Sequence, residues 1–352
     1  PSRPFEANIF YPEERALAFP EAMVVQGAVA APIMAASGDA VLAYNVSSFV
    51  GFALTGWAFC LLVRRWTGSW SAGYVSGSLA AFNSFTLVQL THLQFLHAEF
   101  VALMLFALDR LITVRQWRHA FGLAAGFALQ ALTSVYLMVF SVWLLLFACL
   151  ARMRELLGDG AAALKRIAVA AVLAALVLSP YLAEYAAVNR TMGFARGAEE
   201  EEAASWANYV STGSRLHFQS WSRQFTGLAT SNTFPGIAAL ALAVIGLSER
   251  RNAGDLRLRM CVAAAAGCAA VSFAPLLPFY GTLHAIVPLF QAVRVLAHVG
   301  LVVLLMIAIL AGYGVAALQR GWTHSRSWPL AAGMLLVIVN GEGLRAPIAY
   351  TW

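Results

Sequence analysis

Charged residues are scarce in this sequence. Only 11% of the 352 residues are Asp, Glu, Lys or Arg, whereas 61% are hydrophobic, and the mean hydropathy is +0.72. In a soluble domain about a quarter of the residues are charged and about half are apolar. A compact fold in water cannot hide so much apolar surface. The composition therefore excludes a soluble globular protein and predicts an integral membrane protein.

Cysteine and lysine are also rare. The four cysteines all lie inside apolar segments, where a thiol is usually a small buried hydrophobic group, and their spacing matches no disulfide or metal pattern. Of the 23 basic residues, Lys165 alone is a lysine, and the arginines are scattered along the chain. The net charge of +6 is therefore no indication of a nucleic-acid partner, and none is expected.

Long uncharged runs are abundant, and their length sets the type of membrane segment. Residues 41–63, 167–183 and 299–318 contain no charged residue. Crossing a bilayer takes about 20 apolar residues as a helix but only about 10 as a strand, so we predict an all-α, polytopic protein. Apolar runs between arginine flanks give about ten transmembrane helices, near residues 41–63, 71–87, 96–113, 119–133, 134–151, 165–180, 234–248, 260–274, 297–319 and 328–340.

The arginine-rich connections fall on one side of the membrane if the loop at residues 64–70 is cytoplasmic. This orientation divides the chain into five parts. They are an extracytoplasmic loop with an interfacial helix (1–40), transmembrane helices 1–6 (41–186), a second extracytoplasmic loop (187–232), transmembrane helices 7–10 (233–342) and the start of an extracytoplasmic tail (343–352).

Several phrases are specific enough to suggest a family. They include FEANIFYPEERALAFPEAM near the N-terminus, THLQFLHAEFVALMLFALDRL after the second run, and LFQAVRVLAHVGLVVLLMIAILAGYGVAAL near the C-terminus. Over nearly the whole chain the sequence resembles bacterial members of the GT-C superfamily of integral membrane glycosyltransferases. The resemblance implies a GT-C-like, multi-pass protein of the bacterial inner (cytoplasmic) membrane, surrounded by membrane lipid, that uses a polyprenyl-phosphate-linked sugar.

The same resemblance implies a catalytic acid early in the first extracytoplasmic loop, shortly after a transmembrane helix. No such helix precedes Phe5. We therefore expect the chain to be truncated at both ends relative to the family, with the family's acid outside it. A divalent metal cofactor stays open, because the superfamily includes metal-dependent and metal-independent members. A larger membrane complex is also open as a partner.

Polar residues gather between the second and third runs, on the outer side. Ionisable groups near a membrane are costly unless they line a cavity or find a partner, so we predict His92 and Glu99 as catalytic residues. Gln94 and His97 lie between them and are predicted to contact the substrate. The alternative is that this loop anchors the chain at the membrane interface. The spacing of His92 and His97 does not place both on one helical face, and no metal site is predicted.

Two other outer positions complete the predicted site. Glu184 is predicted as a third catalytic residue, with Tyr181 as a substrate contact, unless the carboxylate only reaches toward water. Arg294 and His298 are predicted to bind the lipid phosphate, because a guanidinium offers a planar, permanently charged fork. The alternative for Arg294 is a contact with ordinary lipid headgroups.

Other charged groups receive simpler interpretations. Asp109 most simply pairs with its neighbour Arg110 at a cytoplasmic helix end. The run Glu199–Glu202 most simply forms a solvated acidic loop or helix start.

The predicted function is transfer of a sugar from a polyprenyl-phosphate carrier to an extracytoplasmic acceptor. The alternative is a non-catalytic membrane scaffold subunit that keeps the GT-C-like fold. A transporter is the less favoured alternative, since transporters usually place polar groups near the bilayer midplane. Here Glu99, Glu184 and Arg294 lie near the outer ends of their runs.

Overall fold

The computed structural model describes residues 5–6, 9–12, 14–19, 21–193, 197–225, 227–322 and 326–345. These residues form α-helices, short 3-10 helices and connecting loops, with no strand among them. The all-α prediction is confirmed. Of the tail predicted at 343–352, residues 346–352 lie outside the described residues.

Ten helices overlap the ten predicted runs. They are α2 (Ala40–Thr67), α3 (Trp70–Ala81), α5 (Glu99–Val114), α6 (Trp117–Thr133), α7 (Val135–Ala151), α8 (Met153–Met192), α10 (Ile237–Ser248), α11 (Leu256–Ser272), α14 (Gly300–Gly321) and α15 (Trp328–Gly343). Shorter helices connect them: α1 (Val24–Ser37), α4 (Ser84–Val88), α9 (Arg215–Ser220), α12 (Tyr280–Ile286) and α13 (Pro288–Gln291).

Polar residues set several helix ends. The Asp39 carboxylate accepts hydrogen bonds from the backbone N–H groups of Val41 and Leu42 and so begins α2. That helix ends at Gly68, whose φ of 76° lies in the left-handed region that favours glycine. The run predicted at 71–87 is divided, because the Asn83 side chain accepts from the N–H of Thr86 and starts a separate helix, α4.

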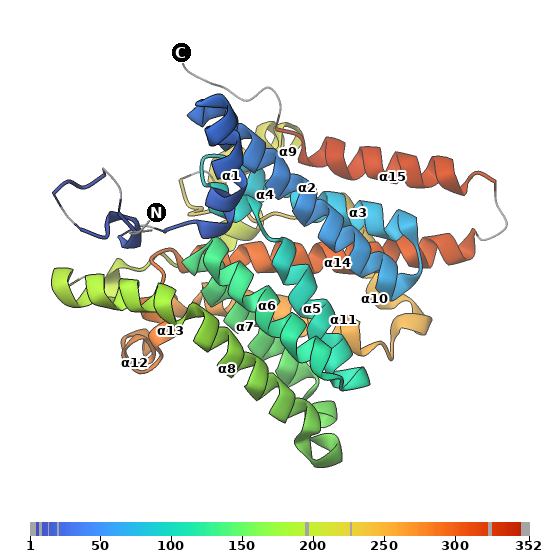
Figure 1. Cartoon of the computed structure of the whole chain (residues 1–352). Helices are drawn as coiled ribbons and strands as arrows, with labels where there is room; N and C mark the ends of the chain where they lie inside the picture. The colour runs from blue at the N-terminus through green and yellow to red at the C-terminus, as the bar shows by residue number, and fades with distance from the viewer. Residues whose placement is uncertain are drawn as a thin grey trace.

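Helix α14 forms the centre of the molecule. It packs against α3, α10 and α11, and Figure 1 shows it crossing the middle of the bundle. The approach to α10 is close: a Cβ atom added at Gly314 would collide with the carbonyl oxygen of Leu242. The small side chain therefore allows the two backbones to touch, as is common between membrane helices.

Three described helical segments are long and apolar enough to cross a membrane: Ala40–Thr67, Ala161–Met192 and Leu296–Gly321. They differ in their surroundings. In the most apolar part of Leu296–Gly321, 89% of the residues are buried within the protein, against 22% in Ala161–Met192. Because apolar residues of the second segment face outward, its outer face requires an apolar solvent. The structure supports a membrane protein.

Helices α6, α7 and α8 lie side by side at the edge of the bundle (Figure 1). The chain turns sharply between α6 and α7 at Ser134, whose extended backbone interrupts the helix. Pro180 lies inside α8, and a proline there removes one backbone hydrogen bond and favours a kink. The turn at Ser134 and the second half of α8 form two sides of the site described below.

The pairing predicted for Asp109 is wrong. One carboxylate oxygen accepts from Arg152 Nη1 at 2.7 Å and the other from Arg257 Nε at 3.0 Å. Neighbouring side chains on a helix do not face each other, so Arg110 points elsewhere. Asp109 and Arg152 are both 1% exposed, so this ion cluster is a buried contact between α5, the α7–α8 turn and α11.

The acidic run Glu199–Glu202 is only partly solvated, which also corrects the prediction. Glu199 and Glu200 are exposed, whereas Glu201 is buried. Its carboxylate accepts a hydrogen bond from the Tyr280 hydroxyl and lies 3.0 Å from His284 Nε2. The run docks onto α12 through this one residue, which a charge pattern alone does not distinguish from its neighbours.

Candidate functional site

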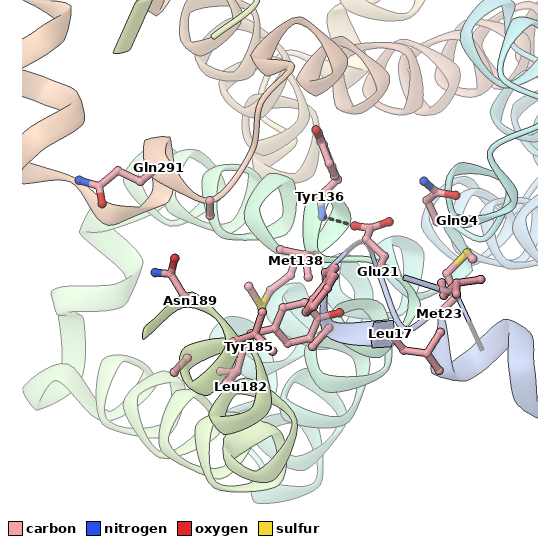
Figure 2. Close-up of a pocket in the computed structure, with 17 residues that line it drawn as sticks. Leu17, Glu21, Met23, Gln94, Tyr136, Met138, Leu182, Tyr185, Asn189 and Gln291 are labelled. Carbon is pink, nitrogen blue, oxygen red and sulfur yellow. Dashed lines mark hydrogen bonds between the residues drawn. The ribbon is translucent and has the colours of Figure 1, made fainter. Parts of the chain in front are cut away.

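A cavity of about 750 Å³ opens at the N-terminal end of α7. Its walls come from the N-terminal segment (the described residues between 9 and 23), from α7 and α8, and from the end of α13. Most of the lining is apolar, and the polar members are few (Figure 2). The lining residues are Ile9, Leu17, Ala18, Phe19, Glu21, Met23, Gln94, Val135, Tyr136, Met138, Leu182, Tyr185, Ala186, Val188, Asn189, Gln291 and Ala292.

Glu21 is the only acidic residue among these described lining residues. Its Oε1 accepts from the Ser134 hydroxyl at 2.7 Å and from the backbone N–H of Tyr136 at 3.1 Å. The first N–H groups of a helix have no partner within the helix and attract negative charge. The start of α7 therefore holds this carboxylate in place, as the dashed line in Figure 2 shows for Tyr136.

The second oxygen of Glu21 is different. Oε2 is buried and makes no hydrogen bond to any described residue. Burial raises the pKa of Glu21 above that of an ordinary carboxyl group, although the bonds from Ser134 and the α7 backbone oppose the rise. A raised pKa makes a carboxylate a stronger base, which favours a role as a general base.

Two tyrosines of α8 form one wall. The Tyr185 hydroxyl accepts from the backbone N–H of Ala22 at 3.0 Å and lies 3.1 Å from the Tyr181 hydroxyl. The Phe5 ring packs against both rings. Tyr185 lines the cavity, whereas Tyr181 is 6% exposed and lies behind it. Tyr181, predicted as a substrate contact, is thus separated from the cavity by Tyr185.

Three carboxamides also line the cavity. The side chains of Gln94 and Asn189 have no hydrogen-bond partner among the described residues, while Gln291 donates to the carbonyl of His284 at 2.7 Å. In Figure 2 the side chain of Asn189 lies between those of Gln291 and Tyr185. Of the sequence-predicted site residues, Gln94 is the one that belongs to the cavity lining.

His97 and Glu99 form a buried pair away from the cavity. His97 Nδ1 lies 3.0 Å from Glu99 Oε1, and His97 Nε2 lies 3.1 Å from the carbonyl oxygen of Ser47. The other Glu99 oxygen accepts from the Thr55 hydroxyl at 3.3 Å. Gln130 donates to the His97 carbonyl at 2.9 Å. The pair joins α2, α5 and α6, and both histidine nitrogens are engaged within the protein.

His92 and His298 lie on either side of Phe95. The His92 ring is exposed and its centre lies 6.2 Å from that of Phe95. The His298 ring contacts Phe85, Phe95 and Tyr136, and its Nδ1 is buried without a hydrogen-bond partner among the described residues. Through Tyr136, His298 lies directly behind the cavity wall. Neither histidine lines the cavity.

The remaining predicted residues form exposed ion pairs at the rim. Glu184 Oε2 lies 2.9 Å from Arg15 Nε and ties α8 to the N-terminal segment. Arg294 Nη2 lies 3.2 Å from Glu202 Oε1, and the backbone N–H of Arg294 donates to the Tyr136 hydroxyl at 3.3 Å. The roles assigned to His92, Glu99 and Glu184 from the sequence remain predictions.

Sequence reasoning missed Glu21 as a functional residue. It stands at the start of the apolar run that becomes α1, and an isolated carboxylate at the edge of such a run is a functional candidate by default. Its neighbours Ser134 and Tyr136 are more than 100 positions away, so no local pattern connects them.

Comparisons with known proteins add no assignment. No protein-family model matches this sequence, and no curated protein matches it.

Proposed function

We propose that this protein is a membrane glycosyltransferase of the GT-C type, which transfers a sugar from a polyprenyl-phosphate carrier to an extracytoplasmic acceptor. The single observation that carries the proposal is the carboxylate of Glu21 in a largely apolar cavity, where its buried Oε2 lacks a partner among the described residues. An apolar pocket with a few convergent polar groups and an acid of perturbed pKa is a typical active site.

The cavity suits an amphipathic donor. Its apolar wall, from side chains such as Leu17, Met138 and Leu182, offers a surface for the first isoprene units of a lipid. The polar tips of Gln94, Asn189 and Tyr185 offer hydrogen-bond partners for sugar hydroxyls. A lipid could reach the site along α8, whose apolar residues face outward.

In the proposed reaction Glu21 is the general base. Its carboxylate removes the proton from the acceptor hydroxyl, whose oxygen then forms a bond to the anomeric carbon of the donor. The bond between that carbon and the phosphate oxygen breaks, and the electron pair leaves with the lipid phosphate. The α7 N-terminus fixes the base through Ser134 and Tyr136, so its orientation is set before the substrates bind.

Arg294 is the proposed phosphate ligand. It follows the cavity residues Gln291 and Ala292, and its side chain is 61% exposed. An exposed ion pair contributes about 0–1 kcal/mol, so the pair with Glu202 can exchange for a phosphate at little cost. A guanidinium there stabilises the negative charge on the departing lipid phosphate.

The proposal includes the finer architecture that the sequence predicts. We place about ten transmembrane helices in the bacterial inner membrane, with the cavity on the extracytoplasmic side. Helices shorter than a full span, such as α7 with 17 residues, would cross together with their flanking loops. A divalent metal and a larger membrane complex stay open as cofactor and partner.

The test is sugar transfer by the purified protein in liposomes. Farnesyl-phospho-glucose serves as a short-chain donor probe, and formation of a glycosylated lipid or glycan product is followed by mass spectrometry with a panel of extracytoplasmic acceptors. Product from the wild-type protein but not from Glu21→Gln supports the proposal. Equal product from both proteins overturns the assignment of Glu21, and binding of the probe without product favours the scaffold alternative.

A further inference from the structure

The charges around the cavity are unequal. Among the seventeen described residues that line it, Glu21 is the one charged side chain, and the lining contains no Arg, Lys or His. At the rim, Arg15 and Arg294 each pair with a carboxylate, and Arg190, next to the lining residue Asn189, donates to the carbonyl oxygen of Ala186. Apart from the lipid phosphate, which Arg294 is proposed to bind, a negative group against these lining residues would meet a carboxylate and no cation.

The uncharged polar groups point to hydroxyls as the matching ligand groups. The carboxamides of Gln94 and Asn189 can each donate and accept hydrogen bonds, and no described residue occupies them. Glu21 Oε2, when ionised, only accepts, so its partner must be a donor such as a hydroxyl or an amine. A sugar hydroxyl is such a donor, whereas a sugar carboxylate is not.

We propose that this cavity selects a glycosyl group without a negative charge, and that Glu21, Gln94 and Asn189 exclude acidic sugars such as uronic acids. This inference rests on the proposed function, since it names the class of sugar that the same cavity takes. Moving an ionised carboxylate into an apolar site without a cation is unfavourable, and a second carboxylate nearby increases the cost. Burial raises the pKa of Glu21, so some of this repulsion is relieved at low pH.

The test compares two probes that differ in one group. Farnesyl-phospho-glucose and farnesyl-phospho-glucuronic acid share lipid, phosphate and ring, and only the second has a carboxylate on the sugar. Their affinities for the full chain in detergent are measured by microscale thermophoresis at pH 7.5, with farnesyl phosphate as reference. We expect the glucosyl probe to bind at least about tenfold more tightly than the glucuronyl probe.

Variants identify the residues responsible. In Glu21→Gln the discrimination should fall below about threefold, because a neutral amide does not repel a carboxylate. Glu14→Gln changes an exposed acid of the same segment and should keep the wild-type ratio. Asn189→Ala should lower the affinity for the glucosyl probe without changing the affinity for farnesyl phosphate. This variant still tests the inference if Glu21→Gln does not fold.

Each outcome is decisive. Affinities within about twofold for the two probes in the wild type, or discrimination unchanged in Glu21→Gln, would overturn the inference. Discrimination without any sugar transfer supports the inference and overturns the proposed enzymatic function. Transfer at equal efficiency from both probes supports the function and overturns the inference. If neither probe binds, both are overturned.

Discussion

A carboxylate is held near each end of α7, and the two differ in how many of their oxygens have a partner within the protein. At the N-terminal end, Glu21 has one oxygen bound to Ser134 and the α7 backbone and the other without a partner among the described residues. Beyond the C-terminal end, Asp109 has both oxygens matched by the guanidinium groups of Arg152 and Arg257.

The difference separates a structural carboxylate from an available one. A buried ion that is fully paired holds elements together but has no capacity left for a ligand. A buried carboxylate oxygen without a partner lowers the free energy of unfolding. A ligand-binding role in the adjacent cavity explains why such a residue is kept. Burial alone therefore does not identify a site; the unmatched oxygen beside the cavity does.

The largest expected effect is at the Asp109 end. Asp109→Asn removes the negative charge that two arginines share, so we expect a loss of about 3–5 kcal/mol in the free energy of unfolding. Unfolding by SDS in mixed micelles measures it. The double variant Asp109→Asn with Arg152→Met removes a stranded cation and should recover part of the loss. A loss below about 1 kcal/mol in the single variant would show that the cluster is not a structural contact.

At the Glu21 end we expect a large effect on activity and a small effect on stability. Glu21→Gln should lower the rate of sugar transfer by about a hundredfold to ten-thousandfold, because the general base is lost. Its effect on stability should be within about 1 kcal/mol, since the amide oxygen still accepts from Ser134. Transfer assays and SDS unfolding on the same preparation provide both numbers, with Glu14→Gln as the exposed control.

The pH dependence of Glu21 sharpens the comparison further. Burial raises the pKa of Glu21 above its ordinary value of 4.5. The rate of sugar transfer should therefore increase with pH as Glu21 loses its proton, and this rising limb of the pH–rate profile should lie above the pH range in which ordinary carboxyl groups ionise. Ser134→Ala removes a bond that favours the carboxylate and should move this limb to higher pH.

The stability of the folded protein should also depend on the protonation of Glu21. Because folding raises this pKa, the folded protein favours protonated Glu21, and its contribution to stability is fully present below about pH 4.5. The contribution is lost as pH rises through the raised pKa. Thermal midpoints measured across pH should show this decline in the wild type and not in Glu21→Gln. An identical profile in both proteins would contradict a raised pKa.

The smallest effect is expected at the rim. Glu202→Gln breaks the exposed pair with Arg294, so stability should change by less than about 1 kcal/mol. The freed guanidinium should bind farnesyl phosphate up to about fivefold more tightly, and Arg294→Gln should weaken binding by a similar factor. Thermophoresis measures both. No change in either variant would remove Arg294 from the proposed phosphate site.

Helices were predictable because their signal is local. Each predicted run overlaps a helix, since apolar residues between arginines mark a segment that a membrane can hold. The division at Asn83 was missed, because a side-chain cap inside an apolar run leaves no change in hydropathy. The confirmed part of the membrane prediction is three segments of sufficient length and hydropathy.

The site was less predictable because its partners are distant in sequence. Gln94 was identified as a polar residue of the outer loop between the second and third runs, and it does line the cavity. Its neighbours His97 and Glu99 share the same local pattern and yet bond within the protein. Which side of the loop faces the cavity depends on how α2, α5 and α6 pack, and no spacing rule contains that information.

The sequence by itself determined the solvent and the helices of this protein, because transfer of side chains to an apolar medium depends on local composition. Only the tertiary structure decided which buried carboxylate is neutralised and which is available. Asp109 meets Arg257 across 148 positions, and Glu21 meets Ser134 across 113. Such pairings depend on which helix ends come together in space, and that arrangement follows from the packing of the whole bundle around α14.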